Sequence, residues 1–513
     1  MENNLGQILT KRAFLSPDRE AYVCSHSGLR LTFRELNARC NQLANSFLKA
    51  GIEKEERVGL LLMNGVEFME AYFALAKIGA VIVPLNWRLV PDELEFILKD
   101  SGARSLIFDD EFVDTVSELH ARTEKEGKTD IRRWLQVCGE QGAVHFSENY
   151  QDFRDDGAIE EPVVVASDDD MLYIMYTSGT TGLPKGVVHT HDSAMWAILS
   201  VAGTTYYEET DRFLNALPMF HVGALTPLSV NVYRGATSVV MRSFDPVMAW
   251  KLLEEEKIST GLMVPAMLNV MLQVENFQRF DYSRLRWFMT GAAPVPVSLT
   301  LKFVELGIGI LQVYGLTETC GPACLMDSEN AVEKPTSTGK AFFHTDIRVV
   351  NEAGEDCGPF EAGEVLVRGR HIMREYWNRP EATAEAMKDG WLYTGDIALM
   401  DEDGYVSIQD RIKDMIISGG ENVYPAELEA VLVNHPDIAD AAVIGQESER
   451  WGESPFAILV RTHDGVTEAQ VMEYCQGKLA RFKQPQGVTF VDEIPRNPSG
   501  KILKRVLREQ FPG

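Results

Sequence analysis

The chain has 513 residues, more than one hydrophobic core can serve, because cores stop growing at about 250 to 300 residues and longer chains divide into domains. Apolar residues make up 45% and charged residues 24% of the chain, so neither a disordered chain nor a fibrous repeat is favoured. The formal net charge of −27 argues against non-specific nucleic-acid binding, which needs a basic face. Any anionic ligand must therefore meet local groups of positive charge.

Seven cysteines are scattered along the chain, with no CxxC pair and no signal-peptide pattern before them, which favours a reducing cytoplasm. The most apolar long stretch, residues 68–85, carries Glu70 and Lys77, whereas a membrane span needs about 20 apolar residues with few charges. We therefore expect no transmembrane segment. Peripheral contact with a membrane stays open, and the sequence makes no prediction of the oligomeric state.

Alternating helix and strand patterns fill the first part of the chain. Thr32 and Glu35 have the spacing of a capping box, and apolar residues follow at helical period up to Gly51. Strands are then predicted at 58–63, 81–85 and 106–109, and helices at 66–80 and 91–99. Such alternation predicts a largely parallel sheet covered by helices. Residues 123–170 are charged and weakly periodic, and we predict a surface excursion there.

The pattern changes twice in the remainder of the chain. Alternation resumes near residue 165 and continues to about 320, whereas 346–408 shows short strands separated by Gly-containing turns, typical of a small β-rich module. Residues 426–507 indicate a compact α+β unit. We therefore predict an α/β protein with a large N-terminal domain (1–410) of covered, mostly parallel sheets plus the β-rich module. A hinge (411–414) and a small mobile α+β C-terminal domain (415–513) complete the prediction.

A Gly-rich segment, YTSGTTGLPKG at residues 176–186, follows the apolar run 171–175. Its glycines allow close backbone approach, its hydroxyls and free N–H groups can surround phosphate oxygens, and Lys185 adds positive charge. The spacing is not that of a Walker A loop. We interpret the segment as a phosphate-binding loop, and a flexible polar turn between strands is the alternative.

Five further motifs follow in order, at residues 314–318 (YGLTE), 393–396 (YTGD), 411–414 (RIKD), 418–422 (SGGEN) and 495–501 (PRNPSGK). Over essentially the whole chain, this set resembles the adenylate-forming superfamily of acyl-CoA synthetases, aryl-CoA ligases, luciferases and peptide-synthetase adenylation domains. Among these it looks most like a bacterial fatty-acyl-CoA synthetase. The resemblance implies a ligase that uses ATP and Mg²⁺ to adenylate a carboxylic acid, releases pyrophosphate, and passes the acyl group to coenzyme A with release of AMP.

The resemblance also implies roles for individual residues in adenylation. Glu318 would hold Mg²⁺ together with Thr180, and Lys501 would bridge the substrate carboxylate and the α-phosphate, whose charges repel each other. Asp396 would accept both ribose hydroxyls, and Arg411 would help to hold ribose and phosphate. The catalytic candidates are Thr180, Lys185, His221, Glu318 and Lys501. The candidates for ATP or AMP binding are Thr177, Ser178, Gly179, Thr181, Gly182, Gly291, Ala292, Ala293, Pro294, Tyr314, Gly315, Thr317, Asp396 and Arg411.

Some of these residues have simpler alternatives when each is considered alone. Glu318 could be a solvated acid at a helix start, Lys501 an exposed lysine, and residues 291–294 a tight turn. In the resemblance, Tyr314 would instead stack on one face of the adenine and residues 291–294 would lie against the other.

Thioester formation needs a second arrangement, because pyrophosphate must leave and a thiol must reach the acyl carbon. By resemblance, the C-terminal domain turns about a hinge that maps to Lys413 beside Asp414. The CoA-binding candidates are Gly419, Gly420, Glu421 and Trp451.

The acid pocket is expected to be apolar. By resemblance, its candidates are Val222, Gly223, Val264 and Cys320, and Glu318 is the one charged residue in the corresponding segments besides neutral His221. Amino-acid-activating relatives usually carry an aspartate in place of His221, which argues against that branch; a structural histidine is the alternative reading of this residue. Hydroxycinnamate ligases commonly carry a bulky aromatic in place of Gly223, which favours a deeper tunnel and a medium- or long-chain fatty acid.

Three other functions stay open on sequence alone. The first is an aryl (cinnamate-type) CoA ligase, and the second is an acyl-AMP ligase that loads a carrier-protein phosphopantetheine. The third is a non-catalytic nucleotide-binding protein.

Overall fold

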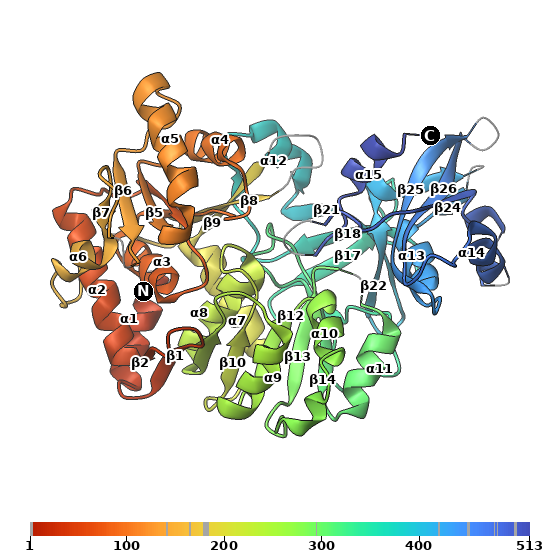
Figure 1. Cartoon of the computed structure of the whole chain (residues 1–513), viewed down its shortest axis with the longest axis horizontal. Coiled ribbons are helices and arrows are strands. Elements are labelled where there is room, and N and C mark those ends of the chain that lie inside the picture. The colour runs from red at the N-terminus through yellow and green to blue at the C-terminus, as the bar shows by residue number, and fades with distance from the viewer. Residues whose placement is uncertain are drawn as a thin grey trace.

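The computed structural model of the chain describes residues 4–139, 142–163, 166–177, 184–293, 295–418, 421–448, 452–476, 478–479, 481–496 and 500–512. Figure 1 shows the chain passing from red and orange elements on the left, through yellow and green elements below, to blue C-terminal elements on the right. Four sheets organise these regions. No helix in these ranges is both long and apolar enough to cross a membrane.

The N-terminal sheet has the strand order β19-β9-β8-β4-β3-β5-β6-β7. Its strands are β3 (Arg57–Leu61), β4 (Val81–Pro84), β5 (Ser105–Asp109), β6 (Arg133–Val137), β7 (Glu148–Asn149), β8 (Met171–Thr177), β9 (Lys185–Thr190) and β19 (Glu375–Tyr376). Every neighbouring pair from β8 to β7 is parallel, whereas β8 and β9 form an antiparallel pair. The accompanying helices are α2 (Phe33–Lys49), α3 (Val66–Ile78), α4 (Pro91–Ser101), α5 (Val113–Glu126) and α6 (Tyr150–Asp155), with the short 3-10 helix η1 (Asp110–Phe112).

The strand and helix predictions for residues 32–109 are confirmed, and so is the capping box. The Thr32 hydroxyl accepts from the Glu35 N–H at 3.3 Å, and the Glu35 carboxylate accepts from the Thr32 N–H at 2.8 Å. The predicted surface excursion at 123–170 is wrong, because β6 lies within the sheet, parallel to β5, and Trp134 and Leu135 are buried. Trp134 and Leu135 stand between the polar residues Arg133 and Gln136, and two adjacent apolar residues are too few to show the periodicity of a strand.

The second large sheet has the strand order β16-β15-β14-β13-β12-β10-β11-β1-β2. Its strands are β1 (Glu20–Cys24), β2 (Arg30–Thr32), β10 (Arg212–Asn215), β11 (Thr237–Val240), β12 (Thr260–Met263), β13 (Trp287–Gly291), β14 (Gly309–Tyr314), β15 (Cys324–Leu325) and β16 (Lys340–Ala341). Its helices are α8 (Val222–Arg234), α9 (Pro246–Glu255), α10 (Pro265–Leu272) and α11 (Val297–Glu305), with η2 (Phe277–Arg279). Helix α7 (His191–Thr204) contacts both α8 and strands β8 and β9 of the N-terminal sheet, and α1 (Gly6–Leu15) packs on α2, α3 and α8. From β14 to β1 all neighbouring strands are parallel.

Two smaller sheets follow. The predicted β-rich module is an antiparallel sheet of β17 (Asp346–Val350), β18 (Gly363–Arg368), β20 (Met387–Lys388), β21 (Trp391–Met400) and β22 (Val406–Arg411), beside α12 (Pro380–Ala386). After η3 (Ile412–Asp414), the C-terminal sheet contains β23 (Ile416–Ser418), β24 (Glu421–Val423), β25 (Ile438–Ser448), β26 (Gly452–Arg461) and β27 (Gly487–Phe490). Its helices are α13 (Pro425–Val433), α14 (Glu468–Cys475) and α15 (Lys504–Gln510), with η4 (Arg481–Lys483). This unit has its own hydrophobic core, as the predicted α+β unit requires.

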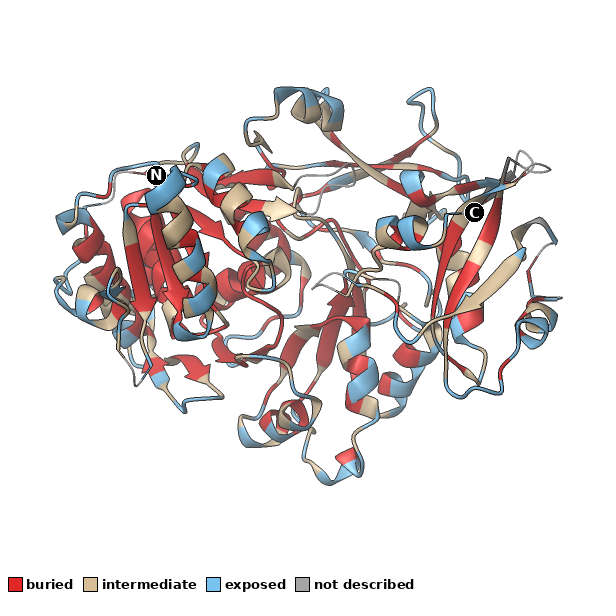
Figure 2. Ribbon diagram, turned by 45° about the horizontal axis from the view of Figure 1, so that its top comes forward, coloured by how far each residue is buried: buried red, intermediate tan, exposed pale blue. Residues whose placement is uncertain are grey.

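Burial follows the sheets. In Figure 2, buried residues concentrate on the strands, whereas the helices at the periphery expose one side. Helix α3 is an exception, because its side chains are buried on nearly every side, including the charged Glu70 and Lys77. A helix apolar all round is typical of a helix enclosed by other elements.

Asn64 connects the two large sheets near the carboxyl ends of their strands. Its amide donates to the carbonyls of Leu217 and Met241 at 2.9 and 3.0 Å, and its side-chain oxygen accepts from the Met219 N–H at 2.8 Å. Asn64 follows β3 of the N-terminal sheet, whereas its partners follow β10 and β11 of the second sheet. One buried amide therefore joins the two sheets at this point. Each of these backbone groups would lose its partner without Asn64.

We therefore expect Asn64→Leu to lower the free energy of unfolding by about 2–4 kcal/mol, since three buried polar groups would lose their partners. The measurement is thermal and urea unfolding of the full-length protein. Asn45→Leu is the matched control, because Asn45 also donates to two carbonyls, those of Ala158 and Glu160, but at an exposed site where water can replace it. Equal losses in the two variants would contradict the proposed connection between the sheets.

Candidate active site

Four neighbouring parallel strands end at one edge of the second sheet. In the order β14, β13, β12 and β10, their carboxyl ends bring together residues that are far apart in the sequence. Tyr314 ends β14, Gly291 ends β13, Val264 follows β12, and the segment leading to His221 follows β10. Ligands of parallel α/β sheets bind outside this edge, so the sheet itself assembles the candidate site.

Two of the predicted nucleotide-binding glycines are required by the backbone. A Cβ at Gly291 would lie 2.1 Å from the Val313 carbonyl oxygen, and one at Gly315 would lie 1.5 Å from the Gly321 carbonyl oxygen. Ala292, next in the chain, has a left-handed φ of 68°. Residues 291–293 therefore make the tight turn that the sequence left as an alternative, and the turns expose the strand ends.

Glu318 lies in the turn after β14 and accepts a hydrogen bond from the Tyr376 hydroxyl at 2.8 Å. The Lys185 ammonium lies 5.0 Å from the centre of the same tyrosine ring. The turn is fixed by its neighbours, because His189 Nε2 is 2.7 Å from the Thr317 carbonyl oxygen. Tyr376 therefore connects two predicted catalytic residues. Sequence analysis missed it because it comes from β19, which pairs with β9 only in the folded sheet.

Asp396 and Arg411 face each other on the neighbouring strands β21 and β22. The Arg411 Nε is 3.2 Å from Asp396 Oδ1, and the Tyr314 hydroxyl donates to Asp396 Oδ2 at 2.7 Å. Asp396 is 4% exposed, and burial raises the pKa of the Tyr314 hydroxyl well above its usual range. The β-rich module thus places the Asp396 carboxylate beside the carboxyl end of β14, where Arg411 and Tyr314 hold it in position.

Lys501 reaches this site from the C-terminal part of the chain. Its neighbour Gly500 adopts a left-handed φ of 83°, and a Cβ there would lie 3.9 Å from Val264. Burial, followed by the charge of Arg411, lowers the pKa of Lys501 to about 7, while Asp396 acts in the opposite direction. Lys501, Arg411 and Asp396 therefore share one electrostatic environment, which favours the neutral amine of Lys501 more than water does.

The predicted hinge residues lie in η3, between the β-rich module and the C-terminal sheet. Burial lowers the pKa of Lys413. Asp414 is buried, and its Oδ1 is 2.9 Å from Arg508 Nη2. Burial favours the neutral acid, but Lys504, Lys413 and Arg508 together lower the pKa of Asp414.

The acid-pocket candidates cluster near the N-terminus of α8. Val222, Val264 and Cys320 belong to one hydrophobic cluster, and a Cβ at Gly223 would lie 3.2 Å from the end of the Leu217 side chain. The Cys320 thiol is 3.0 Å from the Tyr173 hydroxyl, and the Cys320 carbonyl accepts from the hydroxyl of Thr226. These partners of Cys320 could not be predicted, because they come from β8 and α8, which are far from Cys320 in the sequence.

His221 is the residue directly before α8, its side chain makes no capping hydrogen bond to any described residue there, and it is neutral at physiological pH. Burial, and then the charge of Arg88, lowers the pKa of His221 to about 4. Its Nε2 is buried and has no hydrogen-bond partner in the part of the chain that the structure describes. A neutral imidazole with a vacant nitrogen can accept or donate one hydrogen bond to a ligand.

Several predicted residues lie outside the described ranges, namely Ser178, Gly179, Thr180, Thr181, Gly182, Pro294, Gly419, Gly420 and Trp451. The flanks of the Gly-rich segment are described: Thr177 ends β8 and pairs with Lys185, the first residue of β9. Glu421 begins β24.

Comparison with known proteins extends over the whole chain. A profile described as AMP-binding enzyme matches residues 9–377, and one described as AMP-binding enzyme C-terminal domain matches residues 427–501. The chain is 44% identical over 508 residues to long-chain-fatty-acid–CoA ligase FadD13 of Mycobacterium tuberculosis, covering 99% of this chain and 98% of the relative. A feruloyl-CoA synthase of Amycolatopsis sp is 38% identical, with 99% of each chain covered. O-succinylbenzoate coenzyme A synthetase from Bacillus subtilis, solved with ATP and magnesium ion, superposes with a TM-score of 0.87, 32% identity and 99% coverage of both chains.

The lowered pKa of Lys501 predicts a pH-dependent stability. Between its pKa of about 7 in the folded protein and about 10.4 in an unfolded chain, the folded protein binds fewer protons, so the free energy of unfolding rises with pH. We expect Lys501→Met to raise Tm by a few degrees below pH 7, where the penalty on the Lys501 ammonium is complete, and to have a much smaller effect near pH 10.

Lys504→Met is the matched control for this prediction, because Lys504 lies three residues away and forms an ion pair with Glu429. It should lower Tm, since it leaves a buried carboxylate without its cation. A gain in Tm for Lys501→Met that is the same at pH 6 and pH 10 would contradict the analysis.

Proposed function

Because the chain belongs to the AMP-binding enzyme family, we propose that it is an AMP-forming ligase that joins a medium- or long-chain fatty acid to coenzyme A. The ligase class, with ATP, Mg²⁺ and coenzyme A, follows from the family and from its fatty-acid–CoA ligase relatives. The observation that carries the assignment to this site is that Lys501, from the C-terminal unit, shares the environment of Asp396 and Arg411. The cationic side chain of Lys501 is thereby brought near Asp396, the carboxylate proposed to bind the ribose hydroxyls.

In the first step, the substrate carboxylate attacks the α-phosphorus of ATP, and the bond to pyrophosphate breaks. We assign to Lys501 the stabilisation of negative charge where the two anions meet, since a preorganised cation in a site shielded from water acts most strongly there. Asp396 accepts the ribose hydroxyls, with its position set by Arg411 and Tyr314. The anions in turn stabilise the charged form of Lys501.

Glu318 is our candidate for holding Mg²⁺, which supplies positive charge to the phosphates when it is bound. Carboxylate oxygens suit this ion, and Tyr376 orients the side chain through Oε1. No group of three or more His, Cys, Asp or Glu side chains able to hold a metal ion occurs in the described ranges. Glu318 would hold Mg²⁺ together with Thr180, which lies outside the described ranges; one or two carboxylates together with substrate phosphates are typical of Mg²⁺ sites.

In the second step, the thiol of coenzyme A attacks the acyl carbon, the thiol proton is lost, and AMP leaves. We assign the hinge to Lys413 and Asp414, which lie in the one connection between the β-rich module and the C-terminal sheet. Gly419, Gly420, Glu421 and Trp451 are proposed to contact coenzyme A. The domain limits proposed with this hinge are 1–410 and 415–513.

The preference for a fatty acid rests on the surroundings of α8. The cluster that contains Val222, Val264 and Cys320 is apolar, and His221 is neutral rather than an acid that could pair with an amino group. The fatty-acid–CoA ligase relative supports the same choice. We also place the enzyme in the cytoplasm, because all seven of its cysteines are free.

The preference predicts an order of substrates. We expect kcat/KM to be higher for medium- and long-chain acids than for acetate or coumarate, with AMP released only when acid, ATP and coenzyme A are all present. Gly223→Leu should lower kcat/KM for palmitate more than for hexanoate, since a side chain there fills space beside Leu217. The measurement is AMP release over a panel of acids. A higher kcat/KM for coumarate or ferulate would favour an aryl–CoA ligase, and AMP release only with a phosphopantetheine carrier would favour the carrier-loading alternative.

Lys501→Ala should separate the two half-reactions. We expect adenylation to fall about 100- to 1000-fold, the usual effect of removing a preorganised stabiliser of developing charge. Conversion of synthetic acyl-AMP and coenzyme A into acyl-CoA should persist, because no two anions have to meet in that step. The measurements are single-turnover adenylation and acyl-AMP consumption, with circular dichroism as the control for folding. A parallel loss in both would assign Lys501 a structural role.

A further inference from the structure

We propose that Asp410 is a positioning residue for Lys501: it docks the C-terminal unit in the arrangement that carries Lys501 into the adenylation site. The inference rests on the proposed function, because it concerns the first half-reaction. Asp410 acts through Lys504 and through the first turn of α13.

Asp410 belongs to the β-rich module, where it pairs with Ile397 of β21. Its Oδ1 accepts from the Arg411 N–H at 2.7 Å, and its Oδ2 accepts from the Ala426 N–H at 2.9 Å. Ala426 is the second residue of α13, whose N-terminal N–H groups lack partners within the helix. A carboxylate from the module therefore caps a helix of the C-terminal unit, where the helix dipole favours negative charge.

Lys504 is the second contact of Asp410. Its ammonium lies 2.9 Å from Glu429 Oε1 and 3.9 Å from Asp410 Oδ2, and the side chain is 9% exposed. Burial favours the neutral amine, but Glu429 and Asp410 raise the pKa of Lys504 above its usual value. Glu429 belongs to α13 and Asp410 to β22, so Lys504 joins carboxylates from both sides of η3.

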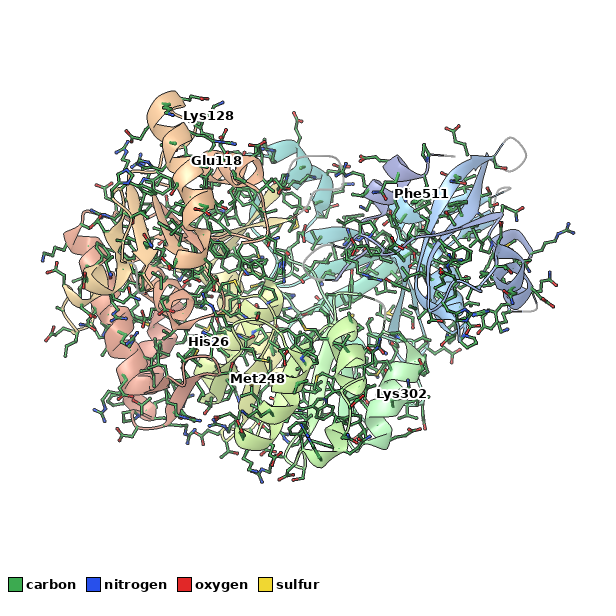
Figure 3. All side chains as sticks on the ribbon, in the orientation of Figure 1. His26, Glu118, Lys128, Met248, Lys302 and Phe511 are labelled. Carbon is green, nitrogen blue, oxygen red and sulfur yellow. The ribbon has the colours of Figure 1, made fainter. Side chains whose placement is uncertain are left out.

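Helix α15 is rigidly attached to the C-terminal sheet, so its first residues carry Lys501 with them. Leu507 is buried in a cluster with residues of β25 and β26, and Gln446 of β25 donates to the Phe511 carbonyl at 3.2 Å. Figure 3 labels Phe511 among the blue C-terminal elements on the right. Arg508, one turn after Lys504, pairs with Asp414 directly after the proposed hinge residue.

The loop that precedes α15 is held in the same way. The Leu503 N–H donates to the Pro495 carbonyl at 2.9 Å, and Arg496 donates to the Gly500 carbonyl at 2.7 Å. Asp410 is therefore connected to Lys501 in few steps. Asp410 pairs with Lys504, Lys504 is the first residue of α15, and the loop before α15 carries Lys501. Asp410 is the member of this path that belongs to the module, so its loss should release the docking and leave the C-terminal unit folded.

The docked arrangement has an electrostatic cost. Burial, and then the charges of Arg411 and Lys413, disfavour the Lys501 ammonium, and Asp396 and Asp414 offset part of this cost. Asp410 supplies an attraction between the same two parts of the chain, through Lys504 and α13. We therefore expect Asp410 to favour the adenylation arrangement and to be dispensable for the step that does not use Lys501.

The test is Asp410→Asn in the full-length enzyme. The amide oxygen can still accept a backbone N–H, but the attraction for Lys504 is lost. We expect single-turnover adenylation of palmitate to fall about tenfold, which corresponds to about 1.4 kcal/mol. Turnover of synthetic palmitoyl-AMP with coenzyme A should stay within about twofold of wild type. Asp410→Glu, which keeps the charge, should recover part of the adenylation rate.

The matched control is Glu427→Gln, which breaks the 2.7 Å ion pair of Glu427 with Lys483 on the same helix α13 but away from Lys504. It should leave both half-reactions unchanged. Unchanged adenylation in Asp410→Asn, or equal loss in both half-reactions with a lower Tm, would overturn the positioning role. Failure of the proposed function is distinguishable, because the wild-type enzyme itself would then not adenylate palmitate.

Discussion

The Lys501 ammonium is brought out of water into a site that already contains the Arg411 guanidinium, and the surrounding structure has to accommodate that placement. Asp396 and Asp414 offset part of this cost, but Asp396 already accepts from Arg411 and Tyr314, and Asp414 accepts from Arg508. Burial is the main cause that disfavours the Lys501 ammonium, followed by the charge of Arg411. A triphosphate and a carboxylate, which bring negative charge, are ligands that favour the charged form of Lys501.

The same balance of charges would make the arrangement of the two parts depend on the ligands. In the mechanism proposed above, the charges of ATP and the acid hold Lys501 in place, and the Asp410 contacts add to this attraction. When pyrophosphate leaves, part of that negative charge leaves with it, and we propose that repulsion among Lys501, Arg411 and Lys413 then favours separation of the two parts about η3. The electrostatics would thus give the proposed departure of Lys501 a physical cause.

The sequence predicted the parts of this protein that depend on local pattern. The capping box at Thr32, the alternating elements that follow it and the four regions of structure all come from periodicity and turn chemistry. The contacts that join distant segments left no such signal. Tyr376 reaches Glu318 across 58 positions, and Arg508 reaches Asp414 across 94. Such pairs depend on strand order and helix docking, which periodicity does not encode.

The acid pocket and the nucleotide site share one piece of backbone. Cys320 lies two residues after Glu318 in the turn that follows β14, and its partners come from α8 and from β8, the strand that leads into the Gly-rich segment. Packing around Cys320 and the position of Glu318 are therefore connected through one turn, in which Gly315 lies too close to the Gly321 carbonyl for any side chain. Because of this connection, the fit of the acid's tail and the position of the proposed metal ligand are not independent. An acid that fills the pocket poorly should lose rate in adenylation as well as affinity, which is the expected behaviour when binding energy is used to align the reacting groups.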